Sequence, residues 1–409
     1  MYEKDAFFDT ISLMRIRLYN ALIYPSLALG EIWTAEDKII FAGEKPRTIP
    51  QNFDKQIDIQ GNLIMPGFKN AHAHSTMTFL RSKAEGLPLA RWLNDAVWPE
   101  EDKLTEELVY KYTRIALEEY IQGGITAAFD QYFFTEAVAQ AFIDSGVRLV
   151  VCTSFTTSKP ADEIAKIYEK FNSLHPLVSC RLGFHAEYTA EPEMLINLAK
   201  VAREYRAPVF FHNSETRQEV RACIQRRGIT PTQYAASFGL LKYGGGGFHS
   251  VFLNKDDIAL YKDSGTAAIT CPASNLKLAS GIAPLKNYQA AQIKLGIGTD
   301  GPASNNALDM FREMYLATVL QNIRFKSAAA GTPEFWLNAA ACENARIIGL
   351  DNADALEAGK LADLIVIDLA APNMLPRNDI LKNTVLAGGK QNVLLTMVAG
   401  KILFERTGR

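Results

Sequence analysis

Hydrophobic and polar positions divide the 409-residue chain into three zones. From about residue 13 to residue 64, short runs alternate polar with apolar and β-branched residues between turns, which predicts strands. From about residue 356 the same pattern returns in LADLIVIDL, NVLLTMVAG and KILFE. We therefore expect both chain ends, residues 1–65 and 355–409, to form one small β-sandwich domain.

The central zone, residues 66–354, alternates short apolar runs with segments of helical periodicity. The eight runs are LIMPGF, ITAAFD, VRLVVCT, RLGFHA, PVFFH, GGFHS, TAAITC and IKLGIGTD. Eight strand–helix units in succession predict the α/β class and a closed (β/α)8 TIM barrel. An open doubly wound sheet is the less favoured alternative, because no Gly-rich phosphate loop follows the first run.

Composition narrows the class of protein. The formal net charge is −2 and no basic block is present, so nucleic acid is not an expected partner. The five cysteines form no C-x-x-C pair, and the N-terminus lacks the features of a signal peptide. We expect a cytoplasmic protein with a small-molecule substrate and no membrane partner. Homo-oligomer formation is left open.

The histidines carry most of the chemical signal. Five of the six, with one aspartate, lie at the ends of predicted barrel strands: His72, His74, His185, His212, His249 and Asp300. Active sites of (β/α)8 barrels lie at the carboxyl ends of the strands. Burying five imidazoles and a carboxylate together is costly unless they are paired or bind a metal. The set therefore predicts a metal site.

Imidazole and carboxylate ligands suit Zn²⁺ or Fe²⁺, and a catalytic site keeps one position open for water. We predict His72, His74, His212 and Asp300 as ligands of one divalent metal, Zn²⁺ in preference to Fe²⁺. No lysine ends the fourth or fifth strand, where a bridging ligand for a second metal would be expected. The predicted catalytic residues are Asp300, His249 beside the water, and Glu215, three residues after His212, as general acid and base.

Six motifs resemble the amidohydrolase superfamily, and within it the 5′-methylthioadenosine/S-adenosylhomocysteine deaminase branch that includes chlorotriazine hydrolases. They are PGFKNAHAHSTM, RWLNDAVWPEE, GFHAEYT, HNSET, PASNLKLASGIAP and GTDGPASNN. The resemblance spans about residues 13–405. It implies that Glu215 carries protons to a ring nitrogen and that His249 orients the water. It further implies that His185 hydrogen-bonds a nucleoside, that Trp92 lines the pocket and that Glu101 holds ribose hydroxyls.

The chain departs from this pattern in ways that affect the expected substrate. Residues 149–180 contain no arginine, whereas homocysteine-accepting relatives have arginines there that pair with a carboxylate. Ser250 replaces a usual cysteine, and a glycine run precedes His249, so the sixth strand is expected to be short or distorted. Ser274 and Asn275 are either supports of the site or parts of a simple turn.

The predicted function is hydrolytic deamination of adenosine, 5′-methylthioadenosine or 5′-deoxyadenosine to the inosine analogue and ammonia, with S-adenosylhomocysteine less favoured. Two alternatives stay open. One is deamination or dechlorination of another heteroaromatic ring, such as a pterin, guanine or s-triazine. The other is a barrel that binds purine or metal without turnover.

Overall fold

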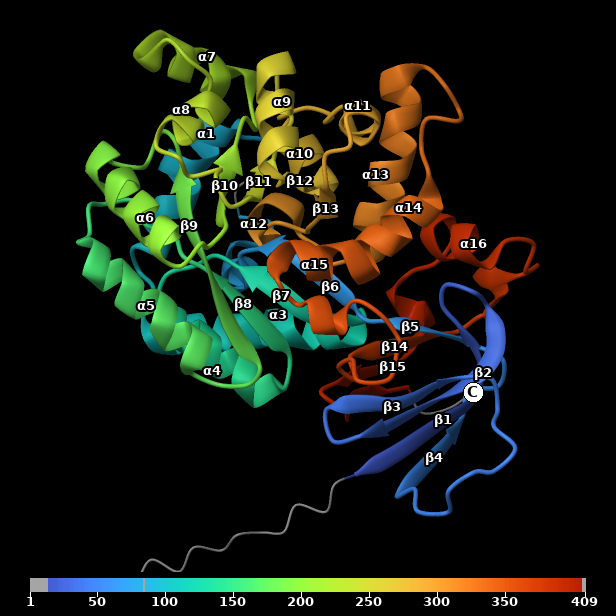
Figure 1. Ribbon diagram of the computed structural model, residues 1–409. Helices are drawn as coiled ribbons and strands as arrows, with labels where there is room; N and C mark the ends of the chain where they lie inside the picture. The colour runs from blue at the N-terminus through green and yellow to red at the C-terminus, as the bar shows by residue number, and fades with distance from the viewer. Residues whose placement is uncertain (1–13, 84, 407–409) are drawn as a thin grey trace, which may run out of the picture.

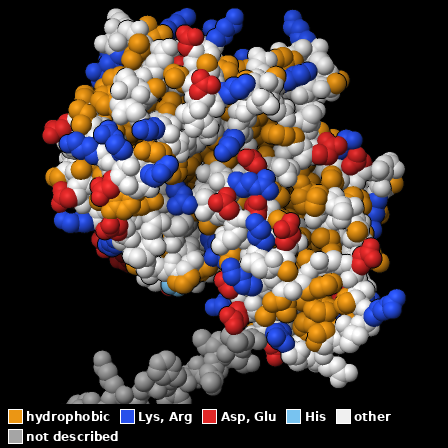
Figure 2. Space-filling model, in the orientation of Figure 1, with side chains coloured by type: hydrophobic (Ala, Val, Ile, Leu, Met, Phe, Trp, Pro, Cys, Tyr) orange, Lys and Arg blue, Asp and Glu red, His pale blue; other side chains and the backbone are white. Residues whose placement is uncertain are grey.

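The computed structural model describes residues 14–83 and 85–406 and has two parts (Figure 1). A parallel barrel surrounded by helices occupies the upper part of the view, and a small sheet made from both chain ends lies below it. Within the described residues, no helix is both long and apolar enough to span a membrane. Basic and acidic side chains are interspersed over the face seen in Figure 2, as expected from the near-neutral charge.

Eight parallel strands form the barrel, and each is hydrogen-bonded to the next in chain order. They are β6 (Phe68–Ala73), β7 (Ile125–Asp130), β8 (Arg148–Cys152), β9 (Val178–Ala186), β10 (Val209–Asn213), β11 (Gly245–His249), β12 (Thr266–Thr270) and β13 (Leu295–Ile297). The first and last strands meet just beyond β13, where Asp300 N donates to His72 O at 3.0 Å. Asn70 also exchanges two hydrogen bonds with Thr299 there. The predicted (β/α)8 barrel is confirmed.

Helices cover the outside of the barrel because their apolar faces pack on the strands. The main ones are α3 (Glu106–Gln122), α4 (Thr135–Ser145), α5 (Ala161–Ser173), α6 (Pro192–Glu204), α7 (Arg217–Arg227), α9 (Lys255–Ser264) and α13 (Met310–Phe325). In α3 the side chain of Thr105 caps the N-terminus, and Val109, Leu117 and Tyr120 are buried. Shorter helices are α8 (Pro231–Ser237), α11 (Leu285–Ala290), α14 (Pro333–Asn338), α15 (Asn344–Ile348) and α16 (Ile380–Leu386).

Short helices also form the loops above the strand ends. After β6 come α1 (Leu89–Arg91), a π-helical turn (Trp92–Val97) and α2 (Trp98–Glu101). After β12 comes α10 (Pro272–Lys277), and after β13 comes α12 (Pro302–Asn305). These loops form the mouth of the barrel, where the predicted site residues lie.

The second sheet joins the two chain ends, as predicted, in the order β16-β15-β14-β5-β1-β2-β3, with β4 paired to β1. The strands are β1 (Arg15–Ile23), β2 (Ala28–Ala35), β3 (Lys38–Gly43), β4 (Lys55–Asp58), β5 (Leu63–Pro66), β14 (Leu364–Ile367), β15 (Val393–Val398) and β16 (Lys401–Glu405). The sheet divides at β1, which pairs with β4 along its first half and with β5 near its end. Residues 1–13 of this predicted domain lie outside the described residues, and the domain limits stay a prediction.

One predicted strand is corrected by the structure. The run LIMPGF does not form the first barrel strand, because β5 belongs to the small sheet and β6 begins only at Phe68. Gly67 alone separates the two strands. A Cβ atom at this position would lie 2.1 Å from Thr126 Cγ2, so only glycine fits the passage from one sheet to the other.

A buried ion pair connects the barrel to the small domain. Arg148 on β8 contacts Asp363 through Nε at 2.5 Å and Nη2 at 3.1 Å, and both side chains are at most 5% exposed. Asp363 Oδ1 also accepts a hydrogen bond from Ala399 N at 2.8 Å. This contact holds β8 against the segment that precedes β14.

Candidate metal centre and active site

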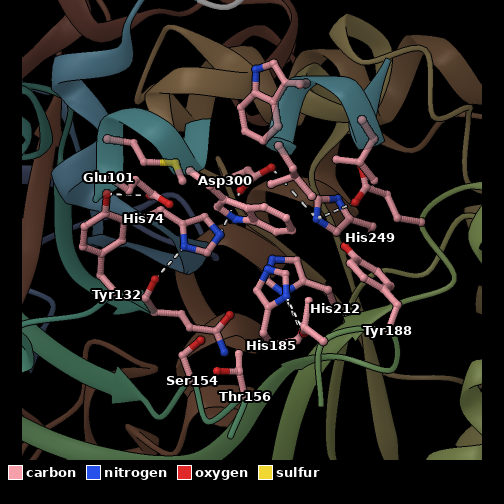
Figure 3. Close-up of a pocket in the computed structure, with 18 of the residues that line it drawn as sticks. His74, Glu101, Tyr132, Ser154, Thr156, His185, Tyr188, His212, His249 and Asp300 are labelled. Carbon is pink, nitrogen blue, oxygen red and sulfur yellow. Dashed lines mark hydrogen bonds and ion pairs between the residues drawn. The ribbon is translucent and has the colours of Figure 1, made fainter. Parts of the chain in front are cut away.

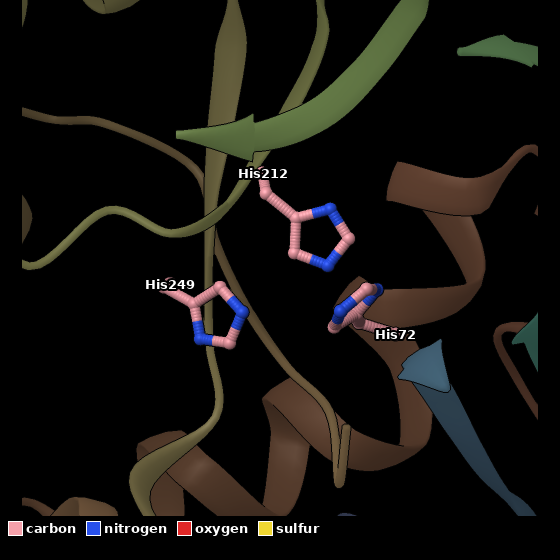
Figure 4. A group of neighbouring side chains, drawn as sticks. All are labelled: His72, His212 and His249. Carbon is pink, nitrogen blue, oxygen red and sulfur yellow. The ribbon is translucent and has the colours of Figure 1, made fainter. Parts of the chain in front are cut away.

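Two overlapping groups of side chains could hold a metal ion at the mouth of the barrel. His72, His74 and Asp300 each offer a ligand atom within 4.8 Å of the others, and so do His72, His212 and His249 (Figure 4). His72 belongs to both groups. The structure thus brings together all four predicted metal ligands and places His249 in a group with two of them.

His72 has the surroundings expected of a metal-binding histidine. It is fully buried on β6, and neither ring nitrogen has a hydrogen-bond partner in the described part of the chain. Its ring stacks on Phe248 with centroids 3.8 Å apart. Burial, with the neighbouring imidazoles, lowers the pKa of His72 well below its usual value, so its lone pair is available. A buried nitrogen without a partner is unfavourable unless it coordinates a metal.

Backbone carbonyls orient two other imidazoles. His74 Nδ1 lies 2.6 Å from Gln131 O, and His212 Nδ1 lies 2.9 Å from His185 O. A carbonyl only accepts, so each Nδ1 carries the proton and each Nε2 is left with a lone pair, which is the usual arrangement of metal-binding histidines. The donor set therefore fits a divalent cation such as zinc.

Asp300 follows the last barrel strand with a φ of +59°, which turns its side chain into the barrel mouth. Its Oδ1 lies 3.3 Å from His74 Nε2 and 3.5 Å from His72 Nε2. Burial disfavours its charged form, but His249, His74 and the hydroxyl of Ser274 outweigh that effect and lower the pKa of Asp300. The carboxyl group is therefore ionised and able to coordinate a cation.

His249 lies on the opposite side of Asp300. Its Nδ1 is 2.8 Å from Asn275 Oδ1, which directs Nε2 toward Glu215 Oε2 at 3.7 Å. The same Nε2 lies 3.9 Å from Asp300 Oδ2 (Figure 3). Burial alone would lower the pKa of His249, but the carboxylates of Glu215 and Asp300 raise it overall. An imidazole with a raised pKa between two acids is suited to accept a proton. The contact with Asn275 favours a supporting role for that residue over a simple turn.

Glu215 lies beside His249. It is buried, and burial raises the pKa of its carboxyl group. Ser280 Oγ donates to its Oε1 at 2.8 Å. Behind it, the side chain of Glu219 accepts hydrogen bonds from Ser214 N at 2.9 Å and Glu215 N at 2.7 Å. The Glu215 carboxyl group is thus held in place, and its raised pKa favours the protonated form.

A cavity of about 210 Å³ opens above this cluster. The predicted substrate-binding residues Trp92, Glu101 and His185 line it, together with Glu215 and with the predicted metal ligands except His72. Glu101 Oε1 accepts a hydrogen bond from Tyr132 at 2.7 Å (Figure 3). Burial raises the pKa of Glu101, and it lowers the pKa of His185 to about 4, so this imidazole is neutral.

Several residues around the site were not predicted. They are Gln131, Tyr132, Ser154, Thr156, Tyr188, Glu219, Ser280, Ser304 and Glu313. Four of them follow β7 or β8 outside the quoted motifs, and their roles depend on which strands are neighbours. Ser304 is different, because it lies in a second copy of the PASN motif that contains Ser274, and this repeat could have identified it.

A parallel barrel with a histidine and carboxylate cluster at its mouth defines a metal-dependent hydrolase. The sequence matches the amidohydrolase family over residues 63–403, and the chain belongs to this family. A 5-methylthioadenosine/S-adenosylhomocysteine deaminase from Natronomonas pharaonis is 37% identical over 361 residues, which cover 86% of this chain and 84% of that protein. A 5′-deoxyadenosine deaminase from Methanobrevibacter smithii is 34% identical, over 97% and 93% of the two chains.

The solved structures agree with this assignment. An adenosine deaminase from Xanthomonas campestris, determined with bound zinc, superimposes with a TM-score of 0.86 at 29% identity. The match covers 95% of this chain and 92% of that chain. The barrel, the second sheet and their relative placement are therefore shared with a zinc-containing protein.

Proposed function

We propose that the protein catalyses the hydrolytic deamination of adenine nucleosides, using one divalent metal held by His72, His74, His212 and Asp300. The observation that carries this proposal is the placement of Glu215. Its carboxyl group, with a raised pKa, lines the cavity and lies 3.7 Å from His249 Nε2, beside the metal cluster. The names of the deaminase relatives support the same reaction.

The ligand set decides which metal we propose. Three imidazoles and one carboxylate fit Zn²⁺ well, and the zinc in the related adenosine deaminase structure supports it over Fe²⁺. When bound, the cation would act as a Lewis acid that makes water a nucleophile near neutral pH. We assign four ligands and leave His249 for the water, because its raised pKa suits a proton acceptor more than a neutral ligand.

The side chains then divide the proton transfers. Water adds to C6 of the purine while His249 and Asp300 accept its proton. Glu215 donates a proton to N1, which neutralises the charge that develops on the ring. The C6 hydroxyl group then passes its proton to Glu215 as the bond between C6 and the amino nitrogen breaks, and the amino group takes a proton from Glu215 or Asp300 and leaves as ammonia. The balance is one water consumed and one ammonia released, with an inosine analogue as the second product.

Three residues are proposed to position the nucleoside. Glu101 accepts hydrogen bonds from the ribose hydroxyls, His185 contacts the purine through its free Nε2, and Trp92 packs on the substrate. The indole Nε1 of Trp92 is buried and has no hydrogen-bond partner among the described residues. Because each of these side chains lines the same cavity as Glu215, one small nucleoside can contact them all.

The lining of the cavity also bears on which chemical group the substrate carries at its 5′ position. Ser154 and Thr156 follow β8 and line the cavity, and they are uncharged. This favours adenosine, 5′-methylthioadenosine or 5′-deoxyadenosine over a ligand with a carboxylate. A second cavity of about 670 Å³ adjoins the first across Tyr188 and contains Arg217 and Arg324. Arginines pair well with carboxylates. S-adenosylhomocysteine, which has a carboxylate, is therefore the compound to compare with the three uncharged nucleosides.

The protein is also proposed to work in the cytoplasm, where thiols stay reduced. All five cysteines are free and buried, which is compatible with a reducing compartment. The proposed partners are small molecules, and oligomeric state is left to measurement.

The test combines metal analysis with a substrate panel. Zinc-loaded enzyme should release ammonia from the three adenine nucleosides faster than from S-adenosylhomocysteine, guanine, a pterin or an s-triazine. Glu215→Gln should retain zinc and lose at least about 100-fold in kcat. Glu204→Gln, an exposed glutamate at the end of α6, is the matched control. Zinc-loaded enzyme that is inert toward every nucleoside refutes the substrate assignment, and tight nucleoside binding without turnover indicates a binding protein.

A further inference from the structure

The tetrapeptide Pro-Ala-Ser-Asn occurs twice in the chain, at residues 272–275 and 302–305. Each copy begins a short helical turn at the carboxyl end of a barrel strand, α10 after β12 and α12 after β13. Because β12 and β13 are neighbours, the two turns lie at adjacent positions on the rim. Neither Ser274 nor Ser304 takes part in the mechanism proposed above.

Both serines bond to the same atom. Ser274 Oγ donates to Asp300 Oδ2 at 2.6 Å, and Ser304 Oγ donates to it at 2.9 Å. Gly301 O also lies 3.1 Å from Ser304 Oγ, but the carboxylate is the closer and stronger acceptor. Both serines are buried, so water does not compete for their hydroxyl groups.

The two oxygens of Asp300 therefore have different surroundings. Oδ2 accepts hydrogen bonds from two hydroxyl groups and lies 3.9 Å from His249 Nε2. Oδ1 receives one backbone hydrogen bond, from Gly301 N at 2.8 Å, and faces His74 Nε2 and His72 Nε2 at 3.3 and 3.5 Å. Oδ1 is thus the oxygen that faces two of the predicted ligands, whereas Oδ2 is held by the two serines.

Glu313 on α13 forms a hydrogen bond with each of the two turns. Its Oε2 accepts a hydrogen bond from Ala273 N in the first turn at 3.0 Å, and its Oε1 accepts one from Asn305 Nδ2 in the second at 2.7 Å. Asn305 Nδ2 also donates to Thr299 O at 2.7 Å, directly before Asp300. Glu313 is fully buried, so one side chain fixes the spacing of the two serines.

We propose that the two Pro-Ala-Ser-Asn turns, tied together by Glu313, are a positioning device that restricts Asp300 to coordination through Oδ1 alone. The serines hold Oδ2 away from the cation, which prevents chelation by both oxygens and preserves a coordination position for water. This inference rests on the metal site of the proposed function but not on its substrate. Ser274, Ser304 and Glu313 act through Asp300 and are positioning residues.

The test uses full-length enzyme and Ser274→Ala, Ser304→Ala and the double variant. Zinc affinity is measured by competition with a chelator, and coordination is read from the visible spectrum of the Co²⁺-substituted protein. We expect each single variant to weaken zinc binding or lower kcat several-fold, and the double variant about 10–100-fold, with KM little changed. Its cobalt bands should lose intensity, because chelation by both oxygens raises the coordination number. Ser237→Ala, which removes a helix hydroxyl remote from the site, is the control.

Two further variants separate positioning from general packing. Ser304→Thr keeps the hydroxyl group and should restore the wild-type cobalt spectrum. Glu313→Gln places an amide nitrogen against one of two N–H donors, so it should change the spectrum in the same direction as the double serine variant. If the zinc affinity, the kcat and the cobalt band intensities of the double serine variant all stay within twofold of wild type, this inference is refuted and the proposed function is unaffected. Wild-type protein that binds no metal overturns the proposed function and this inference together.

Discussion

Removal of the Asp363 carboxylate should destabilise the whole molecule, because it leaves the guanidinium of Arg148 buried without its partner. The pair has two nitrogen–oxygen contacts and almost no exposure to solvent. Breaking such a pair costs about 3–5 kcal/mol. A protein of 409 residues has an unfolding entropy of about 0.8 kcal/mol per degree, so Asp363→Ala should lower Tm by about 4–6 °C.

The assay is calorimetric or circular-dichroism melting of matched variants. Glu405→Ala removes an exposed ion pair with Lys55, each side chain 41% exposed, and should cost at most about 1 kcal/mol. The double variant Arg148→Met, Asp363→Leu should recover much of the lost stability, because apolar residues of similar volume can replace a buried pair. The reasoning is refuted if Asp363→Ala melts no lower than Glu405→Ala.

Three other measurements follow from the site. Prolonged treatment with a chelator should abolish turnover while leaving the barrel folded, and added Zn²⁺ should restore it; activity that survives complete metal removal contradicts the ligand assignment. Glu101→Gln should raise KM for a nucleoside about tenfold or more while kcat changes less, since Glu101 is proposed to bind ribose, and an equal effect on 2′,3′-dideoxynucleosides would argue against that role. Burial raises the pKa of Glu313 to about 8 from 4.5, so its stabilising contribution is complete in acid and is lost as pH rises through about 8. The Tm of wild type relative to Glu313→Gln should therefore fall between pH 5 and pH 9, and a rise would contradict this sign.

Periodicity was sufficient to predict the barrel, because seven of its eight strands are short apolar runs followed by amphipathic helices. The eighth, the first in the chain, was misplaced. LIMPGF reads as one strand, yet Gly67 divides it between two sheets, and the close contact with Thr126 that requires this glycine exists only in the folded protein. The glycine run was expected to shorten or distort the sixth strand, but β11 has five residues, as β8, β10 and β12 do, and it pairs with both neighbours without a register shift.

The sequence could predict those residues of the candidate site that lie at the carboxyl ends of barrel strands. His72, His212 and Asp300 were identified because a parallel barrel brings strand ends together. Tyr132 and Glu313 were not, because their contacts depend on which side chains meet across neighbouring loops and helices. Ser304 shows that a repeated tetrapeptide can reveal such a contact when the strands that precede the two copies are adjacent.

The single glycine between β5 and β6 has a consequence for any attempt to shorten this enzyme. β14, from the C-terminal part of the chain, pairs with β5, and five residues after Gly67 the same backbone reaches His72. A truncation that removed β14 would expose one edge of β5, and no intervening linker would absorb the resulting movement. The C-terminal strands thus belong to the framework of the catalytic centre, although none of their side chains reaches the cavity.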